Sequence, residues 1–161
     1  MTLAAAEAAG VARWCLETAV DYAKVREQFG QKIGAFQSIK HLCAEMLETA
    51  EAVTAAAWDV ASILPRIQRS AYDDGGDDQW AFAADVALVT CFDGAVDNAK
   101  ACIQVLGGIG FTHEHDAHLY LRRAMSLRAL VEASDSAAER LTDRAVAVSY
   151  THLTLPTILR V

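Results

Sequence analysis

The sequence of 161 residues is 53% hydrophobic and 22% charged, which suits one domain with a single buried core. Its formal net charge of -7 argues against nucleic acid as a general partner, because phosphate binding needs a basic surface. No segment approaches the roughly 20 apolar residues of a membrane span and no signal-peptide pattern is present, so we expect a cytoplasmic protein. Abundant alanine, two prolines and few aromatic residues favour long helices, and the predicted fold class is all-α.

Apolar side chains recur on one helical face from residue 3 to about 28, which predicts a first helix. Gly30 and Gly34 bracket a break in the pattern. A stripe with steps of three and four then predicts a long second helix that ends or kinks at Pro65. The positions of this stripe are Phe36, Ile39, Cys43, Met46, Ala50, Val53, Ala57, Val60 and Leu64.

The acidic segment DDGGDD at 73–78 predicts a solvated loop before a third helix over about 79–106. Glu114 and Asp116 suit the start of a fourth helix, because the helix dipole attracts acids there. Ser136 and Glu139 have capping-box spacing, which predicts the start of a last helix. Long helices joined by short connections indicate an up-down bundle.

The ten residues VSYTHLTLPT at 148–157 leave the helical pattern and match, in order, the translation of a transposon-end sequencing adapter. We therefore expect residues 1–147 to form the natural domain and residues 148–161 to be an adapter-derived tail.

The four cysteines lie far apart without a CxxC pair, so neither a metal site nor a disulfide framework is indicated. We expect free thiols that act as small core residues in a reducing compartment. They are Cys15, Cys43, Cys91 and Cys102.

Polar residues follow the first predicted helix in the segment VREQFGQKIGAFQSIK at 25–40. The guanidinium of Arg26 could bind a phosphate through two hydrogen bonds, and Gln28 and Gln37 could bond to the phosphate or to a sugar. The ordinary alternative is that these side chains are solvated and that Phe29 belongs to the core. Spacing alone leaves both interpretations open.

The glycine cluster GGIG at 107–110 follows a predicted helix and does not match the dinucleotide fingerprint, which follows a strand. We expect one glycine to end the third helix in the left-handed conformation. Three glycines in four positions also permit close approach by a ligand or another backbone. His113, His115 and His118 could coordinate zinc with the neighbouring acids, but polar residues at a helix start are ordinarily caps, and we expect no metal site.

The motifs occur in a specific order: R-x-Q-F-G at 26–30, F-Q at 36–37, A-E-M at 44–46, Q-V-L-G-G-x-G-F-T-x-E-H at 104–115 and Y-L-R-R-A at 120–124. In this order they resemble the C-terminal helical domain of the acyl-CoA dehydrogenases. The resemblance implies an α-helical bundle, homo- or hetero-oligomers formed through it, acyl-CoA as substrate, and electron-transfer flavoprotein as a partner.

The resemblance also implies an FAD site shared between subunits. In the family, the R-x-Q-F and Q-x-x-G-G segments of one subunit contact the adenosine diphosphate portion of a neighbour's FAD. An arginine for pyrophosphate, amides for polar edges and glycines for close approach make a coherent set. The residues that map onto it are Arg26, Gln28, Phe29, Gln37, Gln104, Gly107 and Gly108.

In the family reaction a carboxylate removes the α-proton of an acyl-CoA while flavin N5 accepts the β-hydride. The usual base is the glutamate of an E-G-T segment, and here the segment VEAS makes Glu132 the candidate. Some branches carry the base on the first helix, at a position that falls at or just before Met1. Family members have further domains that hold the flavin ring and the acyl-CoA, so we expect these 161 residues alone to be inactive.

Two alternatives remain open at this point. The chain could belong to a non-catalytic assembly subunit of a heteromeric dehydrogenase, or to an acyl-CoA oxidase.

Overall fold

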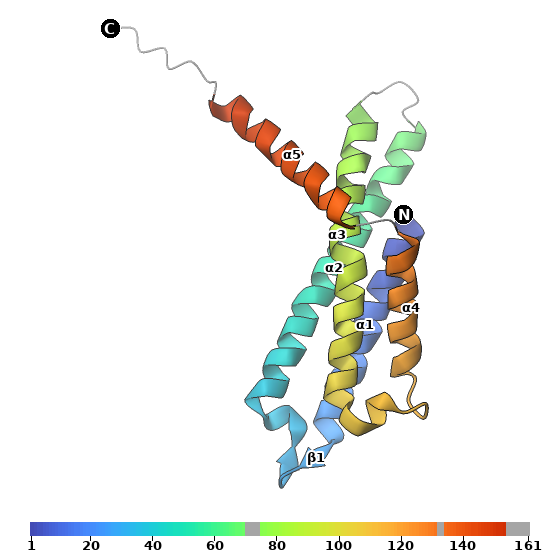
Figure 1. Ribbon diagram of the computed structural model, residues 1–161, viewed down its shortest axis with the longest axis vertical. Coiled ribbons are helices and arrows are strands. Elements are labelled where there is room, and N and C mark those ends of the chain that lie inside the picture. The colour runs from blue at the N-terminus through green and yellow to red at the C-terminus, as the bar shows by residue number, and fades with distance from the viewer. Residues whose placement is uncertain (70–74, 132–133, 154–161) are drawn as a thin grey trace, which may run out of the picture.

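The computed structural model describes the backbone of residues 1–69, 75–131 and 134–153, and the side chains of 1–63, 78–131 and 136–146. Its helices are α1 (Thr2–Val25), α2 (Gln37–Arg69), α3 (Gly75–Leu106), α4 (Ala117–Leu130) and α5 (Ser134–Leu153). The first four run alternately down and up beside one another, whereas α5 leaves the bundle at an angle (Figure 1). The predicted all-α up-down bundle is therefore confirmed. Within the described ranges, no helix combines the length and apolarity needed to cross a membrane.

Two connections, from α1 to α2 and from α3 to α4, lie at the lower end of the bundle (Figure 1). Strands β1 (Glu27–Gln28) and β2 (Gln31–Lys32) form an antiparallel hairpin after α1, and the 3-10 turn η1 (Ile33–Ala35) leads from it into α2. A second 3-10 turn, η2 (Gly107–Phe111), connects α3 to α4. The ends of α1 and α3 and the start of α2 are thereby brought together.

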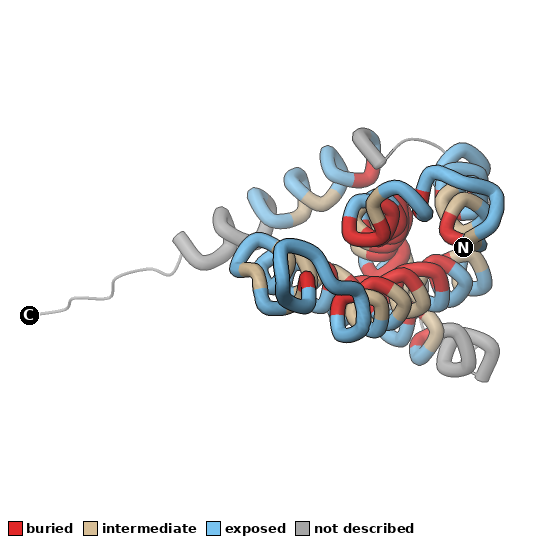
Figure 2. The backbone as a smooth tube through the Cα atoms, turned by 90° about the horizontal axis from the view of Figure 1, so that it is seen from below, coloured by how far each residue is buried: buried red, intermediate tan, exposed pale blue. Residues whose placement is uncertain are grey.

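The core runs along the faces that α1, α2 and α3 turn toward one another (Figure 2). The predicted stripe on α2 is buried at its centre, from Met46 to Val60, while Leu64 lies outside the described side chains. Small side chains let the helices approach closely. On α1 the buried residues are mostly alanine: Ala5, Ala8, Ala12, Ala19 and Ala23.

Two residues of α3 mark how closely the helices pack. A Cβ atom added to Gly94 would lie 2.6 Å from Cγ2 of the buried Val53 on α2. One turn further, the buried Asn98 donates from Nδ2 to the carbonyl oxygens of Ala12 at 3.2 Å and Met46 at 2.9 Å. A single amide thus bridges all three long helices, which fixes their relative heights.

All four cysteines are free, and Cys15, Cys91 and Cys102 are buried in the core, as predicted. Cys43 is half-buried. Burial raises the pKa of the Cys91 thiol to about 11, because a thiolate is poorly solvated there. These residues therefore act as apolar packing groups.

Several predicted helix boundaries were wrong. Helix α1 ends at Val25, before the hairpin. Helix α2 does not end at Pro65 but continues to Arg69, because one missing N–H donor does not by itself end a helix, and the alternative of a kink at Pro65 stays a prediction. Helix α3 begins at Gly75, within the segment that was predicted to be a loop, because acidic residues are favoured in a first helical turn. The first two acids of that segment lie outside the described residues.

The last helix also differs from the prediction. Helix α5 begins at Ser134, so Ser136 is not its cap, and its hydroxyl instead accepts a hydrogen bond from Arg140 Nη1 at 3.3 Å. The backbone remains helical to Leu153, where the sequence pattern predicted a break near residue 148. Arg140 also forms a two-pronged ion pair with the buried Asp85 of α3, which attaches α5 to the bundle.

Candidate functional site

A groove of about 660 Å³ opens at the lower end of the bundle, where α1, α2 and α3 meet the hairpin and η2. Apolar side chains make up most of its walls, and the polar side chains come from α1, β1 and α2. Its lining consists of Tyr22, Arg26, Gln28, Phe29, Ile33, Phe36, Ser38, Ile39, Val105, Leu106, Gly107, Gly108 and Ile109.

The hairpin that forms one wall has an unusual turn. Gln28 pairs with Gln31, and both residues between them have positive φ, 53° at Phe29 and 79° at Gly30. This is the pattern of a type I′ turn, in which asparagine and glycine are the favoured residues. Phenylalanine in the left-handed region is strained, which is a feature often found at functional sites.

The same wall is anchored firmly to the end of α1. The N–H of Ile33 donates to the carbonyl oxygen of Arg26 at 2.8 Å. A Cβ atom added to Gly34 would lie 2.9 Å from the carbonyl oxygen of Ala23, so glycine is needed for this close approach. The hairpin and η1 therefore hold their places relative to the groove.

Phe29 is the exposed aromatic wall of the groove. Its side chain is 92% exposed, and its ring meets Phe36 edge to face, with 6.2 Å between ring centroids. The alternative prediction that Phe29 belongs to the core is therefore wrong. A flat, apolar ligand could cover this ring.

Arg26 provides the charge of the groove. It and Arg122 are the two arginines with described side chains that bond to no carboxylate, and no carboxylate lines the groove among the described residues. An unpaired guanidinium beside apolar walls suits an anionic ligand. The paired arginines are Arg13, Arg123, Arg128, Arg140 and Arg144.

The three glycines after α3 have three different roles. Gly107 has a φ of 63° directly after the last residue of α3, which confirms the predicted left-handed helix end. A Cβ atom at Gly110 would lie 2.8 Å from the carbonyl oxygen of Ile103, so this glycine allows η2 to fold back on α3. A Cβ atom at Gly108 would meet nothing within 4 Å. Gly108 therefore presents open backbone to the groove.

The structure brings together five of the seven residues predicted to contact the cofactor: Arg26, Gln28, Phe29, Gly107 and Gly108. Gln37 and Gln104 are exposed and do not line the groove. Gln37 instead donates from Nε2 to Nε2 of His41 at 2.8 Å.

One predicted residue could not be placed, and two groove residues were not predicted. The candidate base Glu132 lies outside the described residues. Sequence reasoning missed the groove residues Tyr22 and Ser38. Tyr22 could have been found, because it lies four residues before Arg26 and so shares its helical face.

The histidines mainly organise the start of α4. The N–H of Ala117 donates to His115 Nδ1 at 3.1 Å, and His118 Nδ1 donates to the carbonyl oxygen of His115 at 2.8 Å. His113 Nδ1 lies 3.3 Å from His118 Nε2. The predicted role at a helix start is confirmed for His115, whereas the side chain of Asp116 makes no capping bond. Among the described side chains, no group of three or more potential ligands could hold a metal ion.

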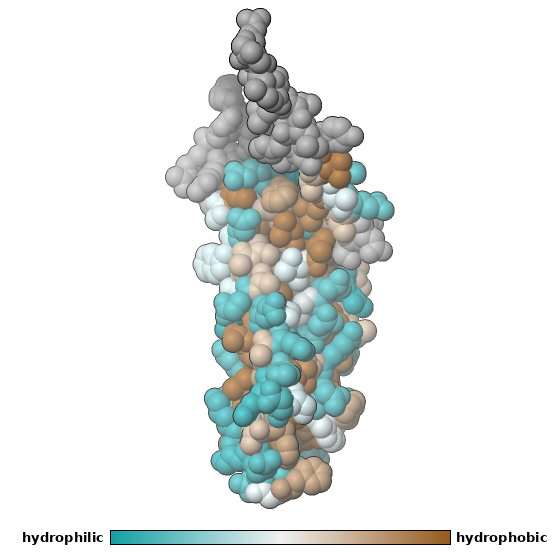
Figure 3. Space-filling view, turned by 90° about the vertical axis from the view of Figure 1, so that its left-hand side faces the viewer, coloured by the Kyte–Doolittle hydropathy of each residue, from teal (hydrophilic) through white to brown (hydrophobic). Residues whose placement is uncertain are grey.

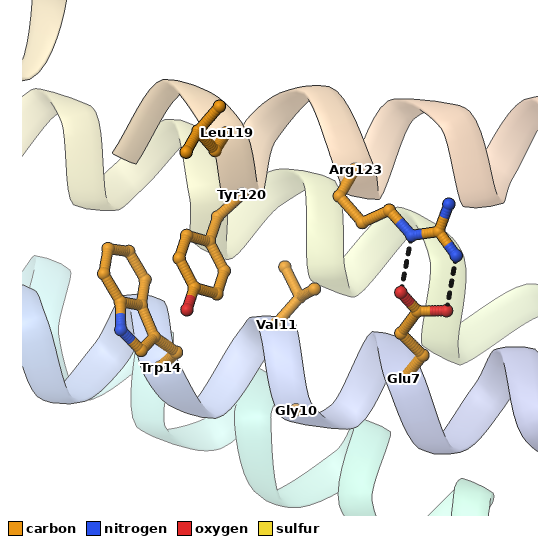
Figure 4. Close-up of a pocket in the computed structure, with 7 residues that line it drawn as sticks. All are labelled: Glu7, Gly10, Val11, Trp14, Leu119, Tyr120 and Arg123. Atoms are coloured by element: carbon orange, nitrogen blue, oxygen red, sulfur yellow. Dashed lines mark hydrogen bonds and ion pairs between the residues drawn. The ribbon is translucent and has the colours of Figure 1, made fainter. Parts of the chain in front are cut away.

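A second groove, of about 510 Å³, lies between α1 and α4 (Figure 4). At one end Arg123 binds both carboxylate oxygens of Glu7, at 2.5 and 2.7 Å, and these hydrogen bonds lower the pKa of Glu7. Near the other end Trp14 stacks on Tyr120, with ring centroids 3.5 Å apart and ring planes 3° apart. These two contacts hold α4 against α1.

The fold and the first groove define a class of protein, an all-α bundle domain with a groove suited to an anionic and partly apolar ligand. The chain belongs to the family of the acyl-CoA dehydrogenase C-terminal domain, whose model matches residues 2–146.

Two curated relatives come from Mycobacterium tuberculosis. Acyl-CoA dehydrogenase FadE34 is 56% identical over 141 residues, which cover 88% of this chain and 19% of the relative. Acyl-CoA dehydrogenase IpdE2 is 39% identical over 139 residues, covering 86% of this chain and 39% of the relative. The chain thus spans less than half the length of these relatives.

Solved structures have the same fold. A variant of the Tcur3481-Tcur3483 steroid ACAD matches with a TM-score of 0.73 and 26% identity, over 92% of this chain and 38% of that chain. Butyryl-CoA dehydrogenase from Megasphaera elsdenii matches with a TM-score of 0.74 and 24% identity, over 89% and 35% of the two chains. The second likeness shows the fold alone.

Proposed function

We propose that the chain is the FAD-contacting and oligomerising C-terminal domain of an acyl-CoA dehydrogenase that catalyses α,β-dehydrogenation of acyl-CoA thioesters. The observation that carries this proposal is the unpaired Arg26 in an apolar groove that also contains the open backbone of Gly107 and Gly108. These residues belong to the two segments whose motifs match the family.

The groove fits the adenosine diphosphate portion of FAD. Arg26 would bind the diphosphate, Phe29 would cover an apolar ring, and Gly108 would let the ligand approach the backbone. The flavin, when bound in the whole protein, supplies the acceptor for the substrate's β-hydride. The described residues of this chain contribute to binding and orienting the other end of that molecule.

The two helix ends from which the alternative catalytic bases would extend lie at the opposite end of the bundle. Helix α4 ends at Leu130, shortly before Glu132, and this end lies beside the start of α1 at Met1 (Figure 1). A base supplied after α4 or just before α1 would therefore act in the same region. This agreement supports a reacting centre near that end, far from the groove.

Association of copies is part of the proposal. Figure 3 views the side on which α2 and α5 lie and shows apolar surface among polar side chains. On α2, Trp58 is 72% exposed and Leu47 is 48% exposed, and association of copies would remove such apolar surface from water. We expect copies of the domain to cover such surface in a homo- or hetero-oligomer, with electron-transfer flavoprotein as the electron acceptor in the cytoplasm.

The role of Arg26 is tested in a family-length protein that contains this chain. Arg26→Ala should lower the amount of FAD that stays bound after gel filtration by at least tenfold, since a charge-assisted contact is lost. Arg122→Ala removes the second arginine that bonds to no carboxylate among the described side chains; it lies outside the groove, and this variant should retain FAD. Equal FAD retention by both variants would contradict the proposal.

The alternatives are separated by the reaction itself. Under anaerobic conditions an acyl-CoA should bleach the bound flavin of a dehydrogenase, whereas a non-catalytic assembly subunit should leave it oxidised. Rapid reoxidation by oxygen with release of hydrogen peroxide would favour the oxidase. Glu132→Gln should abolish the bleaching, and a variant that still bleaches would exclude Glu132 as the base.

A further inference from the structure

The groove contains a polar group that none of the motif matches includes, the hydroxyl of Tyr22. Tyr22 lies in the last turn of α1, where its carbonyl oxygen accepts the N–H of Arg26 at 2.9 Å. Arg26 directly follows the helix, and this hydrogen bond holds it one turn beyond Tyr22. Both residues line the groove.

Tyr22 differs from the other polar side chains of the groove in how firmly it is held. Arg26, Gln28 and Ser38 are exposed, whereas Tyr22 is half-buried and packs against the hydrophobic core. A tyrosine has few rotatable bonds, so packing of its ring fixes the position of its hydroxyl. Within the described chain this hydroxyl hydrogen-bonds to no protein group, although Tyr22 lines the groove.

The ring of Tyr22 packs against the core, and a phenylalanine ring would pack equally well. The hydroxyl group therefore adds nothing to the stability of the fold. The hydroxyl is in contact with solvent in the open groove and would lose that contact when a ligand fills it. A polar group that is desolvated without a partner weakens binding, so the ligand must offer an acceptor there. The acceptors closest to a group bound by Arg26 are phosphate oxygens.

We propose that Tyr22 is a further ligand-binding residue of this groove, and that its hydroxyl donates a hydrogen bond to the diphosphate that Arg26 binds. The proposal rests on the proposed nucleotide-binding function of the groove. In this proposal, Arg26 and Tyr22 bind the diphosphate together. The guanidinium of Arg26 supplies positive charge, and the fixed hydroxyl of Tyr22 supplies a hydrogen bond of defined direction.

The test uses the 161-residue chain with ADP and adenosine as probes, followed through the amide NMR signals of Gly107 and Gly108 during titration. Tyr22→Phe should weaken ADP binding by at least about tenfold, the lower limit for losing one hydrogen bond to a charged group. Adenosine binding and the melting temperature should stay unchanged. Tyr120→Phe, which removes the hydroxyl of the tyrosine in the second groove, should bind ADP like the original chain.

The outcomes separate this inference from the function on which it rests. If the original chain binds ADP and Arg26→Ala weakens it while Tyr22→Phe does not, the inference fails and the groove's function stands. If ADP moves neither glycine signal, or Arg26→Ala has no effect, the proposed function itself fails. A lower melting temperature for Tyr22→Phe would also overturn the inference, because the hydroxyl would then serve the fold.

Discussion

Replacing Phe29 by asparagine separates the strain of the hairpin from the function of the groove. A residue with a side chain in the left-handed region costs about 1–2 kcal/mol, and asparagine recovers much of this because its short side chain hydrogen-bonds locally. Phe29 has a φ of 53° and precedes Gly30, so Phe29→Asn creates the favoured Asn-Gly pair of a type I′ turn.

The substitution also removes an aromatic contact, which offsets part of that gain. The ring of Phe29 is 92% exposed, so little buried area is lost. Its edge-to-face contact with Phe36 is worth about 0.5 kcal/mol, the lower limit for aromatic pairs. The net expectation is a stabilisation of about 0.5 kcal/mol, or a rise of about 1–2 °C in melting temperature for a chain of this size.

Calorimetry of the 161-residue chain measures the stability, and FAD retention by a family-length protein measures the function. We expect Phe29→Asn to melt slightly higher and to lose FAD. Phe111→Asn is a matched control, because Phe111 is 77% exposed but its φ is not positive, and it should gain no stability. A Phe29→Asn variant that melts several degrees lower, or that retains FAD fully, would refute the reasoning.

Three further predictions concern the bundle. Gly94→Ala should destabilise the fold by about 1–2 kcal/mol in urea unfolding, because its new Cβ would overlap the buried Val53; an unchanged midpoint would contradict the close packing. Arg140→Ala should lower the melting temperature more than Arg128→Ala, because only the former leaves a buried carboxylate unpaired; equal effects would contradict this. Burial raises the pKa of Cys91 to about 11. The folded thiol therefore keeps a proton that the unfolded thiol loses above about pH 9. The free energy of unfolding should fall as the pH rises from about 9 to 11. Cys91→Ala should reduce that loss.

Periodicity was sufficient to predict the bundle, because its core follows regular spacing. The α2 stripe through Met46, Val53 and Val60 is buried as expected, since a continuous apolar face of a helix is stable only when it packs against the core. The end of α3 at Gly107 was also predictable, because glycine readily adopts a left-handed helix end. Ser136 shows the limit of local rules, since α5 begins two residues before the expected cap, at Ser134.

The candidate site was less predictable because it depends on tertiary placement. Nothing in the local sequence indicates that Phe29, an unfavourable residue for a left-handed position, forms the tip of a type I′ turn. The motifs named Gln37, but its amide hydrogen-bonds within α2, and no sequence pattern specifies that choice. Tyr22 enters the groove because η1 folds back on α1, a contact that depends on the missing side chain of Gly34.

The placement of the two functional ends leads to a last prediction. Helix α1 has 24 residues, so its ends are about 36 Å apart. Arg26 directly follows one end, and the candidate bases would extend from the helix ends at the other. If each FAD uses the base of one subunit and the groove of another, two inactive variants should complement each other.

Co-expression of Arg26→Ala and Glu132→Gln chains of the family-length protein should restore activity at about a quarter of the sites, since half of the chains supply an intact base and half an intact groove. Mixed oligomers, separated by two different affinity tags, are assayed for acyl-CoA-dependent flavin bleaching. If base and groove served the same FAD from one chain, every site would carry a defect, and the mixed oligomers would be as inactive as their parents.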